Sequence, residues 1–112
     1  MSLIKEVVTF IDSKQGENIK VLKMTKVSPL MDYMVICHVS NQRLLYSLAN
    51  YVEDFFSQKD IQIRPIIKKE DTHWILIDAN DIIVHLFLEE DRQHFALEKL
   101  WKDCLVSVED LQ

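Results

Sequence analysis

Residues 74–91 read WILIDANDIIVHLFLEED, two apolar runs that are joined by a short polar turn and followed by three acidic residues. Apolar runs of this length on either side of turn-forming residues are typical of a β-hairpin. If Ala79 and Asn80 are the two central residues of the turn, the strands pair Asp78 with Asp81, Ile77 with Ile82, Leu76 with Ile83, Ile75 with Val84 and Trp74 with His85. The acidic residues place negative charge where the N-terminus of a helix favours it, so we expect a helix to begin at Glu89.

Alternation of side chains across the hairpin divides it into two faces of different composition. One face is purely aliphatic and is expected to lie under helices; it holds Ile75, Ile77, Ile82, Val84 and Leu86. The other face, called the mixed face below, holds Trp74, Leu76, Asp78, Asp81, Ile83, His85 and Phe87. Large apolar groups combined with acids and an imidazole suit a surface that a protein partner covers part of the time. The alternative is that a helix covers the mixed face permanently, with the two acids serving the turn and the imidazole hydrogen-bonded inside.

The chain before residue 30 predicts a helix followed by a strand. Residues 3–13 carry apolar side chains at helical spacing, with Ser2 as a candidate N-cap and Gly16 just past the end. Residues 18–24 then alternate as a strand does, and the Ser28-Pro29 step closes the segment. We expect this strand to lie near an edge of the sheet.

The next segment predicts the centre of the sheet and a second helix. Residues 32–39 are rich in β-branched and aromatic residues, and apolar side chains occupy both the odd and the even positions. This pattern is typical of a strand that is covered on both faces. Ser40 or Asn41 can cap the helix that follows. Its apolar stripe consists of Leu44, Leu45, Leu48, Val52 and Phe55, and it is widened by Tyr51 and Phe56.

The segments on either side of the hairpin complete the predicted order α-β-β-α-β-β-β-α. Residues 61–67 favour a strand that Pro65 confines to an edge or interrupts, and residues 68–73 favour a polar, mobile loop. The apolar stripe of the helix after the hairpin is supplied by Leu97, Leu100, Trp101 and Cys104. The acidic end of the chain, residues 107–112, is expected to fray.

Length and composition favour a single α/β domain over residues 1–112, with a mixed sheet of about five strands and helices packed on it. Of the 112 residues 48% are apolar, which is ample for one core, and a single glycine leaves little scope for a flexible linker. The start of the chain lacks the pattern of a secretion signal, and no run approaches the roughly 20 apolar residues that span a bilayer. We therefore expect a cytoplasmic protein.

The charge balance argues against a protein that holds nucleic acid mainly through phosphate contacts. The formal net charge is −5, and the basic pair Lys68-Lys69 is followed at once by the acidic pair Glu70-Asp71. Phosphate contacts require a concentrated basic surface. A basic protein is the more plausible partner, with little direct contact to RNA.

Motifs for catalysis or for a cofactor are not found in the sequence. One glycine cannot build a phosphate-binding loop, and no two of the four histidines stand four residues apart as a helical zinc pair would. Asp78 and Asp81 face the same side, but two carboxylates without further oxygen ligands make a poor magnesium site, and turn capping is favoured. Cys37 and Cys104 fall within apolar patterns, so both are predicted to be reduced packing residues. We expect no catalytic residue, no metal and no cofactor.

Several segments of the chain, taken together, resemble the ribosomal silencing factor family, also called Iojap-like. They span about residues 3–101, and their order and separations make the resemblance specific. They are Asp32-Tyr33-Met34-Val35-Ile36-Cys37, Arg43, Trp74-Ile75-Leu76-Ile77-Asp78, Asp81-Ile82-Ile83-Val84-His85-Leu86-Phe87, Glu89-Glu90, Arg92 and Leu97-Glu98-Lys99-Leu100-Trp101.

The resemblance implies a nucleotidyltransferase-like α/β topology without the catalytic residues. It also implies a translational repressor that binds the fourteenth protein of the large ribosomal subunit at the intersubunit face and blocks joining of the small subunit. The family tryptophan corresponds to Trp74. The chain departs from the family pattern where residues 38–41 replace a glycine-containing segment, and where Ala79-Asn80 replaces a glycine-containing turn; asparagine tolerates the positive φ that this turn requires.

Two alternatives to the repressor remain open. One is a magnesium-dependent, nucleotidyltransferase-like enzyme that uses Asp78, Asp81 and Glu89. The other is a dimerisation module in which the mixed face pairs with itself. Even for the repressor, large apolar groups on the mixed face are costly to leave in water, so we expect weak self-association as a homodimer.

Overall fold

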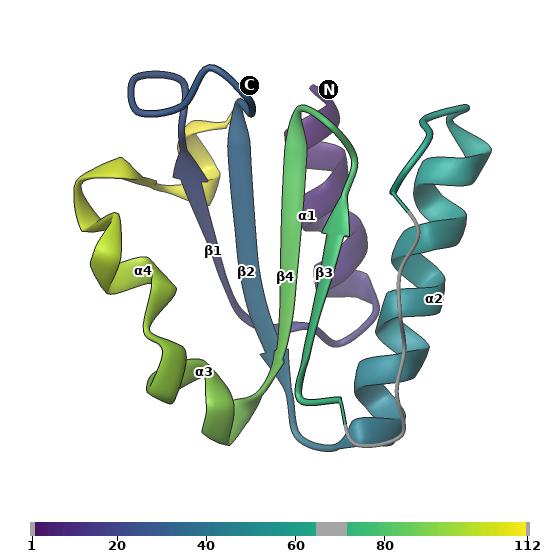
Figure 1. Cartoon of the computed structure of the whole chain (residues 1–112). Helices are drawn as coiled ribbons and strands as arrows, with labels where there is room; N and C mark the ends of the chain where they lie inside the picture. Colours follow the sequence, from purple (N-terminus) through teal and green to yellow (C-terminus); the bar gives the residue numbers. More distant parts are fainter. Residues whose placement is uncertain (1, 65–71, 112) are drawn as a thin grey trace.

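The computed structural model describes residues 2–64 and 72–111. In chain order, the elements are α1 (Leu3–Ser13), β1 (Glu17–Lys23), β2 (Tyr33–Val39), α2 (Gln42–Gln58), β3 (Trp74–Asp78), β4 (Ile82–Leu88), α3 (Glu89–Phe95), α4 (Leu97–Leu100), η1 (Lys102–Cys104), β5 (Leu105–Val106) and η2 (Val108–Asp110). The strands of the described residues form one sheet in the order β3-β4-β2-β1-β5, in which β2 and β4 pair in parallel and the other neighbours pair antiparallel (Figure 1). The predicted α/β class with a mixed five-stranded sheet is confirmed.

The first two helices begin where their capping residues stand. Ser2 Oγ accepts a hydrogen bond from Lys5 N at 3.4 Å, and Asn41 Oδ1 accepts one from Leu44 N at 2.9 Å. Each bond satisfies a backbone donor that has no partner within the helix. The prediction of Ser2 is confirmed, and Asn41, of the two candidates, is the N-cap of α2.

The chain reverses direction after α1 at its one glycine. A Cβ atom at Gly16 would stand 2.4 Å from Ile11 Cγ2, and Ile11 is fully buried. Any larger residue would force the buried isoleucine to move. Gly16 therefore permits the close approach that leads α1 directly into β1.

The main core lies between α1, α2 and one face of the sheet. The aliphatic face of the hairpin is buried there, with exposed fractions of 3% or less for Ile75, Ile77, Ile82, Val84 and Leu86. The strand β2 lies third of five, between β4 and β1, and its side chains are buried or half-buried on both faces. Both predictions are confirmed, and Figure 1 shows α1 behind the sheet.

A second, smaller core covers part of the opposite face. Its buried residues come from β1, the position just after β1, β2 and β4, and they are Leu22, Met24, Met34, Ile36 and Phe87. Leu97, Trp101 and Cys104 pack against them from the chain after α3. These three are the predicted apolar stripe, but the fourth member, Leu100, is 69% exposed. The two thiols are free, as expected; Cys37 is buried in the main core and Cys104 is half-buried.

The predicted hairpin register is wrong by two residues. Trp74 pairs with Phe87, Leu76 with His85 and Asp78 with Ile83, because residues 79–81 and not a two-residue turn connect the strands. Asn80 adopts φ 74°, the positive value that asparagine tolerates. A slip of two residues keeps every side chain on its predicted face, since side chains alternate with a period of two.

The predicted helix after the hairpin is divided. It begins at Glu89 as expected, but Ala96 has φ 50° and ψ 41°, and this left-handed residue separates α3 from the short α4. The acidic residues at the start of α3 complement its positive end.

The structure also corrects two further predictions, the strand at residues 61–67 and the frayed end at residues 107–112. Residues 61–64 form no strand, and the remainder of that prediction, like most of the predicted loop at 68–73, lies outside the described residues. The fifth strand is β5, two residues that pair with β1. After it, η2 returns the chain to the main core, where Leu111 is only 7% exposed. Apolar burial at this leucine holds the end of the chain in place.

Candidate protein-binding face

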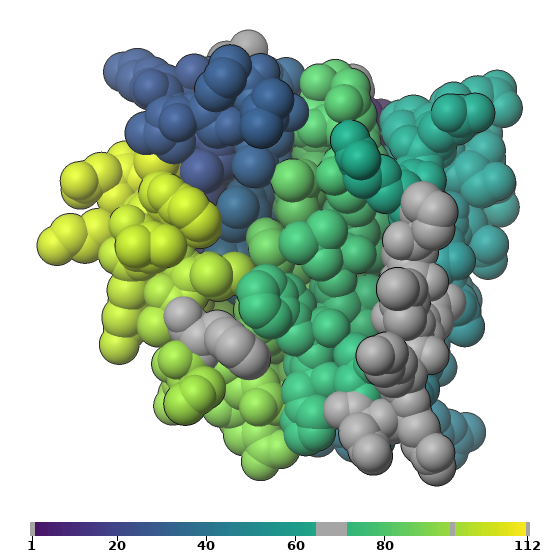
Figure 2. Space-filling model, viewed as in Figure 1, coloured from purple at the N-terminus to yellow at the C-terminus, as the bar shows by residue number. Residues whose placement is uncertain are grey.

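The mixed face is divided into an open part and a buried part. The open part consists of Trp74, Leu76, Asp78, Asp81 and Ile83, all of which are exposed or half-buried, with Leu76 43% exposed. Figure 2 shows atoms of β3 and β4, in green, at the surface in the middle of this view. The chain after α3 packs over the β1 and β2 side of the same face. Of the helices that the structure describes, α1 and α2 lie on the opposite face of the sheet.

The buried part consists of His85 and Phe87, with exposed fractions of 4% and 1%. Sequence reasoning grouped both with the residues that contact a partner. Phe87 belongs to the second core, and Trp74 lies against that core from the side of β3. Neither His85 nor Phe87 therefore presents a surface to a partner in this structure, so both lie beneath the candidate contact residues rather than among them.

Three aromatic rings form a stack on the mixed face. The centroid of the Trp74 indole lies 5.1 Å from that of Phe87 with an interplanar angle of 24°, and 5.7 Å from that of His85. His85 and Phe87 are themselves 6.3 Å apart and nearly parallel, at 12°. Rings at these separations attract one another beyond the effect of area burial alone. The stack connects the half-exposed tryptophan to the buried part of the face.

Within the described residues, the buried imidazole of His85 has a hydrogen-bond partner on one of its two nitrogens. Trp74 Nε1 donates to His85 Nδ1 at 3.1 Å, so the proton of the neutral ring is on Nε2. Among residues 2–64 and 72–111, the buried His85 Nε2 has no hydrogen-bond partner. Burial lowers the pKa of His85 from 6.5 to about 4. A histidine that is hydrogen-bonded inside was one of the sequence alternatives, and it holds for this residue.

The two acids of the mixed face have different surroundings. Asp78 Oδ1 accepts a hydrogen bond from Asn80 N at 2.9 Å, and Asp78 Oδ2 lies 3.0 Å from Arg64 Nε. The prediction that Asp78 serves the turn is confirmed. Asp81 is exposed, and its backbone oxygen accepts hydrogen bonds from Asp32 N and Tyr33 N, which ties the turn to the start of β2. The side chain of Asp81 thus remains at the surface.

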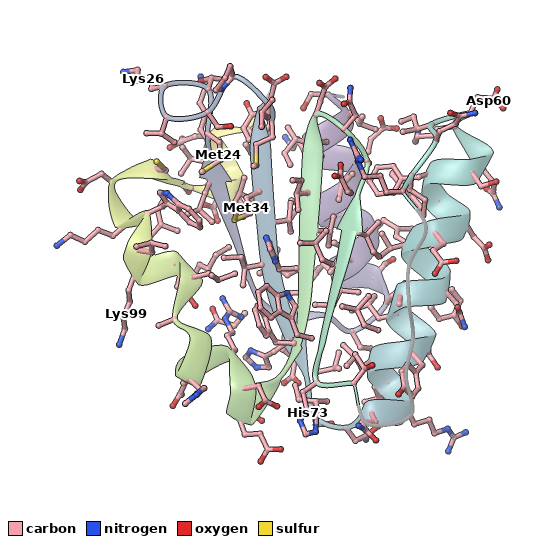
Figure 3. The ribbon with its side chains drawn as sticks, in the orientation of Figure 1. Met24, Lys26, Met34, Asp60, His73 and Lys99 are labelled. Carbon is pink, nitrogen blue, oxygen red and sulfur yellow. The ribbon has the colours of Figure 1, made fainter. Side chains whose placement is uncertain are left out.

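The acids proposed for a magnesium site do not form a close ligand group. In the described part of the chain, the group of three side chains close enough to share a metal ion is His73, Glu90 and Asp91. His73 is at the lower end of β3 in Figure 3, and its Nδ1 lies 2.7 Å from Asp91 Oδ2. The group includes none of the three acids of the magnesium-dependent alternative, Asp78, Asp81 and Glu89.

A buried arginine joins the segments that lie beside the open part of the mixed face. Sequence reasoning quoted this residue only as part of the family resemblance. Arg92, on α3, is 4% exposed; its Nε lies 2.9 Å from Glu98 Oε1, and its Nη1 lies 3.0 Å from His38 Nδ1 and 3.3 Å from Glu17 O. A buried guanidinium requires such partners, because an unpaired charge in the interior is very costly. Arg92 thereby joins α3 to β1, β2 and α4. Sequence periodicity gives no signal for a contact between residues so far apart.

The second core continues toward the β1–β2 loop through two methionines. Figure 3 shows Met24 and Met34 between the strands and the chain that contains α4. Both are buried, whereas Val27 and Leu30 in the loop above them are 55% and 78% exposed.

Within the described residues, no helix is both long and apolar enough to cross a membrane.

Comparisons with known proteins give matches over almost the whole chain. The profile of the family described as "Ribosomal silencing factor during starvation" matches residues 1–112. A Bacillus subtilis (strain 168) protein named "Ribosomal silencing factor RsfS" is 31% identical over 103 residues, which are 92% of this chain and 87% of that protein. A mouse protein named "Mitochondrial assembly of ribosomal large subunit protein 1" is 26% identical over 88% of this chain and 44% of its own length.

Two crystal structures are similar to this chain in fold as well as in sequence. One, from Bacillus halodurans, has a TM-score of 0.80 and 30% identity, with 94% of this chain and 96% of that chain covered. The other, from Chromobacterium violaceum, has a TM-score of 0.80 and 26% identity, with 90% and 88% covered. The overall fold is therefore shared with proteins of known structure.

Proposed function

Because the chain belongs to the ribosomal silencing factor family, we propose that it represses translation by binding the large ribosomal subunit. In this proposal it binds at the intersubunit face, on the fourteenth large-subunit protein, and keeps the small subunit from joining by occupying the space. It acts by steric exclusion and catalyses no reaction. The mouse relative is named for assembly of the ribosomal large subunit, which supports the choice of that subunit.

The open part of the mixed face carries the proposal. Trp74 and Leu76 place an aromatic ring and a 43%-exposed aliphatic side chain side by side on β3, at the edge of the sheet. Buried aromatic anchors provide much of the binding free energy in protein interfaces, and the surrounding polar residues exclude water. The partner contacts proposed are accordingly Trp74, Leu76, Asp78, Asp81 and Ile83, with His85 and Phe87 beneath them.

Charge supports a protein rather than RNA as the surface that is contacted. The chain carries a net charge of −5, and Asp81 is exposed beside the apolar groups of the open part. A basic protein surface complements these acids, whereas RNA phosphate repels them. The proposal therefore assigns the main contacts to a basic ribosomal protein, with little direct contact to RNA.

A pair of leucine variants tests the face with a matched control. Leu76 is 43% exposed on β3, and Leu105 is 41% exposed on β5, at the opposite edge of the sheet. Serine at either position removes a similar amount of exposed apolar surface at little cost to the fold. In co-sedimentation with purified large subunits, we expect Leu76→Ser to weaken binding and Leu105→Ser to leave it unchanged. Equal effects of the two substitutions would contradict the assignment of the face.

Replacement of the tryptophan should have the largest effect on binding. We expect Trp74→Ala to raise the dissociation constant for large subunits roughly 30-fold or more, as loss of an aromatic anchor that contributes about 2 kcal/mol would. Tyr51→Ala is the control, since Tyr51 is an aromatic residue that is 46% exposed on α2. Circular dichroism should accompany both titrations, because Trp74 also packs against the second core. Wild-type affinity of a folded Trp74→Ala protein would refute the proposed anchor.

The two sequence-based alternatives remain testable beside this proposal. Saturable binding of a nucleoside triphosphate with magnesium, measured by calorimetry, would support the enzyme and count against the repressor. Weak self-association through the mixed face stays a prediction: sedimentation at high protein concentration should show a homodimer whose population falls in Leu76→Ser. A monomer at all concentrations would contradict it.

A further inference from the structure

We propose that His85 is a positioning residue, which holds the Trp74 indole in the orientation that the partner recognises. The inference rests on the proposed function, since it concerns the same face. It gives His85 a different role from that of a contact residue, because a side chain that is 4% exposed cannot meet a partner directly.

The geometry of the hairpin places the imidazole where it can set the angle of the indole. Trp74 is directly opposite Phe87, and His85 is its diagonal neighbour, two residues back along β4. Diagonal neighbours across a sheet are within reach of aromatic side chains. Phe87 supports the plane of the indole by stacking, at a centroid separation of 5.1 Å. The hydrogen bond of 3.1 Å from Trp74 Nε1 to His85 Nδ1 then selects one rotation of the indole over that support.

The chemistry of the pair fixes the direction of the bond. An indole N–H can only donate, so the imidazole must accept, and it accepts through Nδ1 only as a neutral ring with its proton on Nε2. Burial favours this neutral form. Phenylalanine or leucine at position 85 would offer the indole no acceptor.

The other nitrogen shows that packing alone does not explain a histidine at this position. The Nε2–H group is buried and has no partner among the described residues, although a buried donor without an acceptor costs folding free energy. The neighbours of His85 in the sheet are Leu76 and Ile36, and an aliphatic residue between them would avoid that cost. Residues that break a local rule in this way are expected at functional sites. The bond to Trp74 is the use of the imidazole that the structure shows.

The test separates orientation from stability with His85→Leu. In the free protein, we expect the Trp74 Nε1–H resonance in a ¹H–¹⁵N spectrum to shift and to exchange faster with solvent; Trp74→Phe distinguishes it from that of Trp101. Large-subunit binding should weaken about tenfold, the effect of losing one orienting hydrogen bond. The thermal midpoint should stay the same or rise, because the unpaired donor is removed. A merely structural histidine would instead give a lower midpoint.

A double-mutant cycle with Trp74→Phe provides the control. Phenylalanine keeps an aromatic ring but has no N–H to donate, so His85→Leu should have no further effect on binding in the Trp74→Phe background. Additive losses would overturn the proposal, and so would an unchanged indole resonance or a His85→Leu protein that unfolds. If Trp74→Ala weakens large-subunit binding but His85→Leu does not, only this inference fails. If Trp74→Ala itself has no effect, the proposed function fails.

Discussion

A histidine beneath an aromatic stack makes the stability of this protein depend on pH. The pKa of His85 is lowered to about 4 by burial, whereas an unfolded chain has a histidine pKa near 6.5. Between these two values the unfolded state binds more protons than the folded state, so the free energy of unfolding falls as the pH falls. Protonation of this group has no effect on stability above about pH 6.5, and it lowers the free energy of unfolding by on the order of 3 kcal/mol as the pH falls to about 4.

Denaturant titrations at several pH values between 7.5 and 4 measure this dependence. All other ionisable side chains are the same in the wild type and in His85→Leu. The difference between the wild-type and His85→Leu profiles therefore isolates His85. We expect the wild type to lose more stability than the variant between pH 6.5 and 4. Parallel profiles would show that His85 has the same pKa in the folded and the unfolded protein, which would contradict this prediction.

Single residues on the mixed face were predicted only in part. Alternation along the strands placed Trp74 and His85 on one face, and the possibility of a hydrogen-bonded histidine followed from the residue type. Phe87 belongs to the second core, against which Leu97 and Trp101 pack from a separate segment, and His85 lies against Trp74. Contacts of this kind have no signature in the periodicity of either segment. The same holds for Arg92 and its contact with His38.

At the scale of elements, the break at Ala96 is the largest departure from the periodic pattern. A left-handed conformation costs an alanine roughly 1 kcal/mol, whereas glycine adopts it freely. We expect Ala96→Gly to raise the free energy of unfolding by about 0.5–1 kcal/mol. Ala49→Gly, in the middle of α2 and fully buried, should lower it by a similar amount or more. Chemical denaturation of the two variants measures both effects, and equal destabilisation would contradict the conformation at Ala96.

The sequence was most informative where an element carries a full period of its pattern. Helices α1 and α2 and strand β2 follow their stripes and caps, so the limits of α1 and β2 and the start of α2 were predicted to within about a residue. The two residues of β5 are too few to show alternation. Residues 61–64 have the composition of a strand but form none, although Arg64 N donates a hydrogen bond to Asp78 O at the end of β3. Alanine gives no hint of a left-handed turn, which is why the division between α3 and α4 was missed.

At the scale of the whole molecule, charge sets how binding should respond to salt. Exposed charge pairs contribute only about 0.2–1 kcal/mol each and are screened by salt. We expect Asp81→Asn to slow association with the isolated ribosomal protein modestly, whereas Trp74→Ala should mainly speed dissociation. Asp54→Asn is the matched control, because it makes the same change in net charge at an exposed position on α2.

Surface-immobilised binding at a series of salt concentrations completes that test. Affinity should fall gently with added salt, far less than for a protein held by many phosphate contacts. A steep dependence on salt, or binding to naked ribosomal RNA but not to the isolated protein, would overturn the assigned partner. Equal slowing by Asp54→Asn would show that net charge, and not the open part of the mixed face, governs association.

From the parallel pairing of β2 with β4, we expect a particular order of folding during synthesis of the chain. These neighbouring strands in the middle of the sheet match Tyr33 to Ile82, so α2 and β3 stand between them in the chain. Contacts between residues so distant in sequence form slowly and late. A nascent chain that ends before Ile82 can form α1, the β1–β2 hairpin and α2, but β2 then has a free edge. The main core closes only when β4 has emerged, and until then the apolar surfaces of β2 and α2 are open to aggregation.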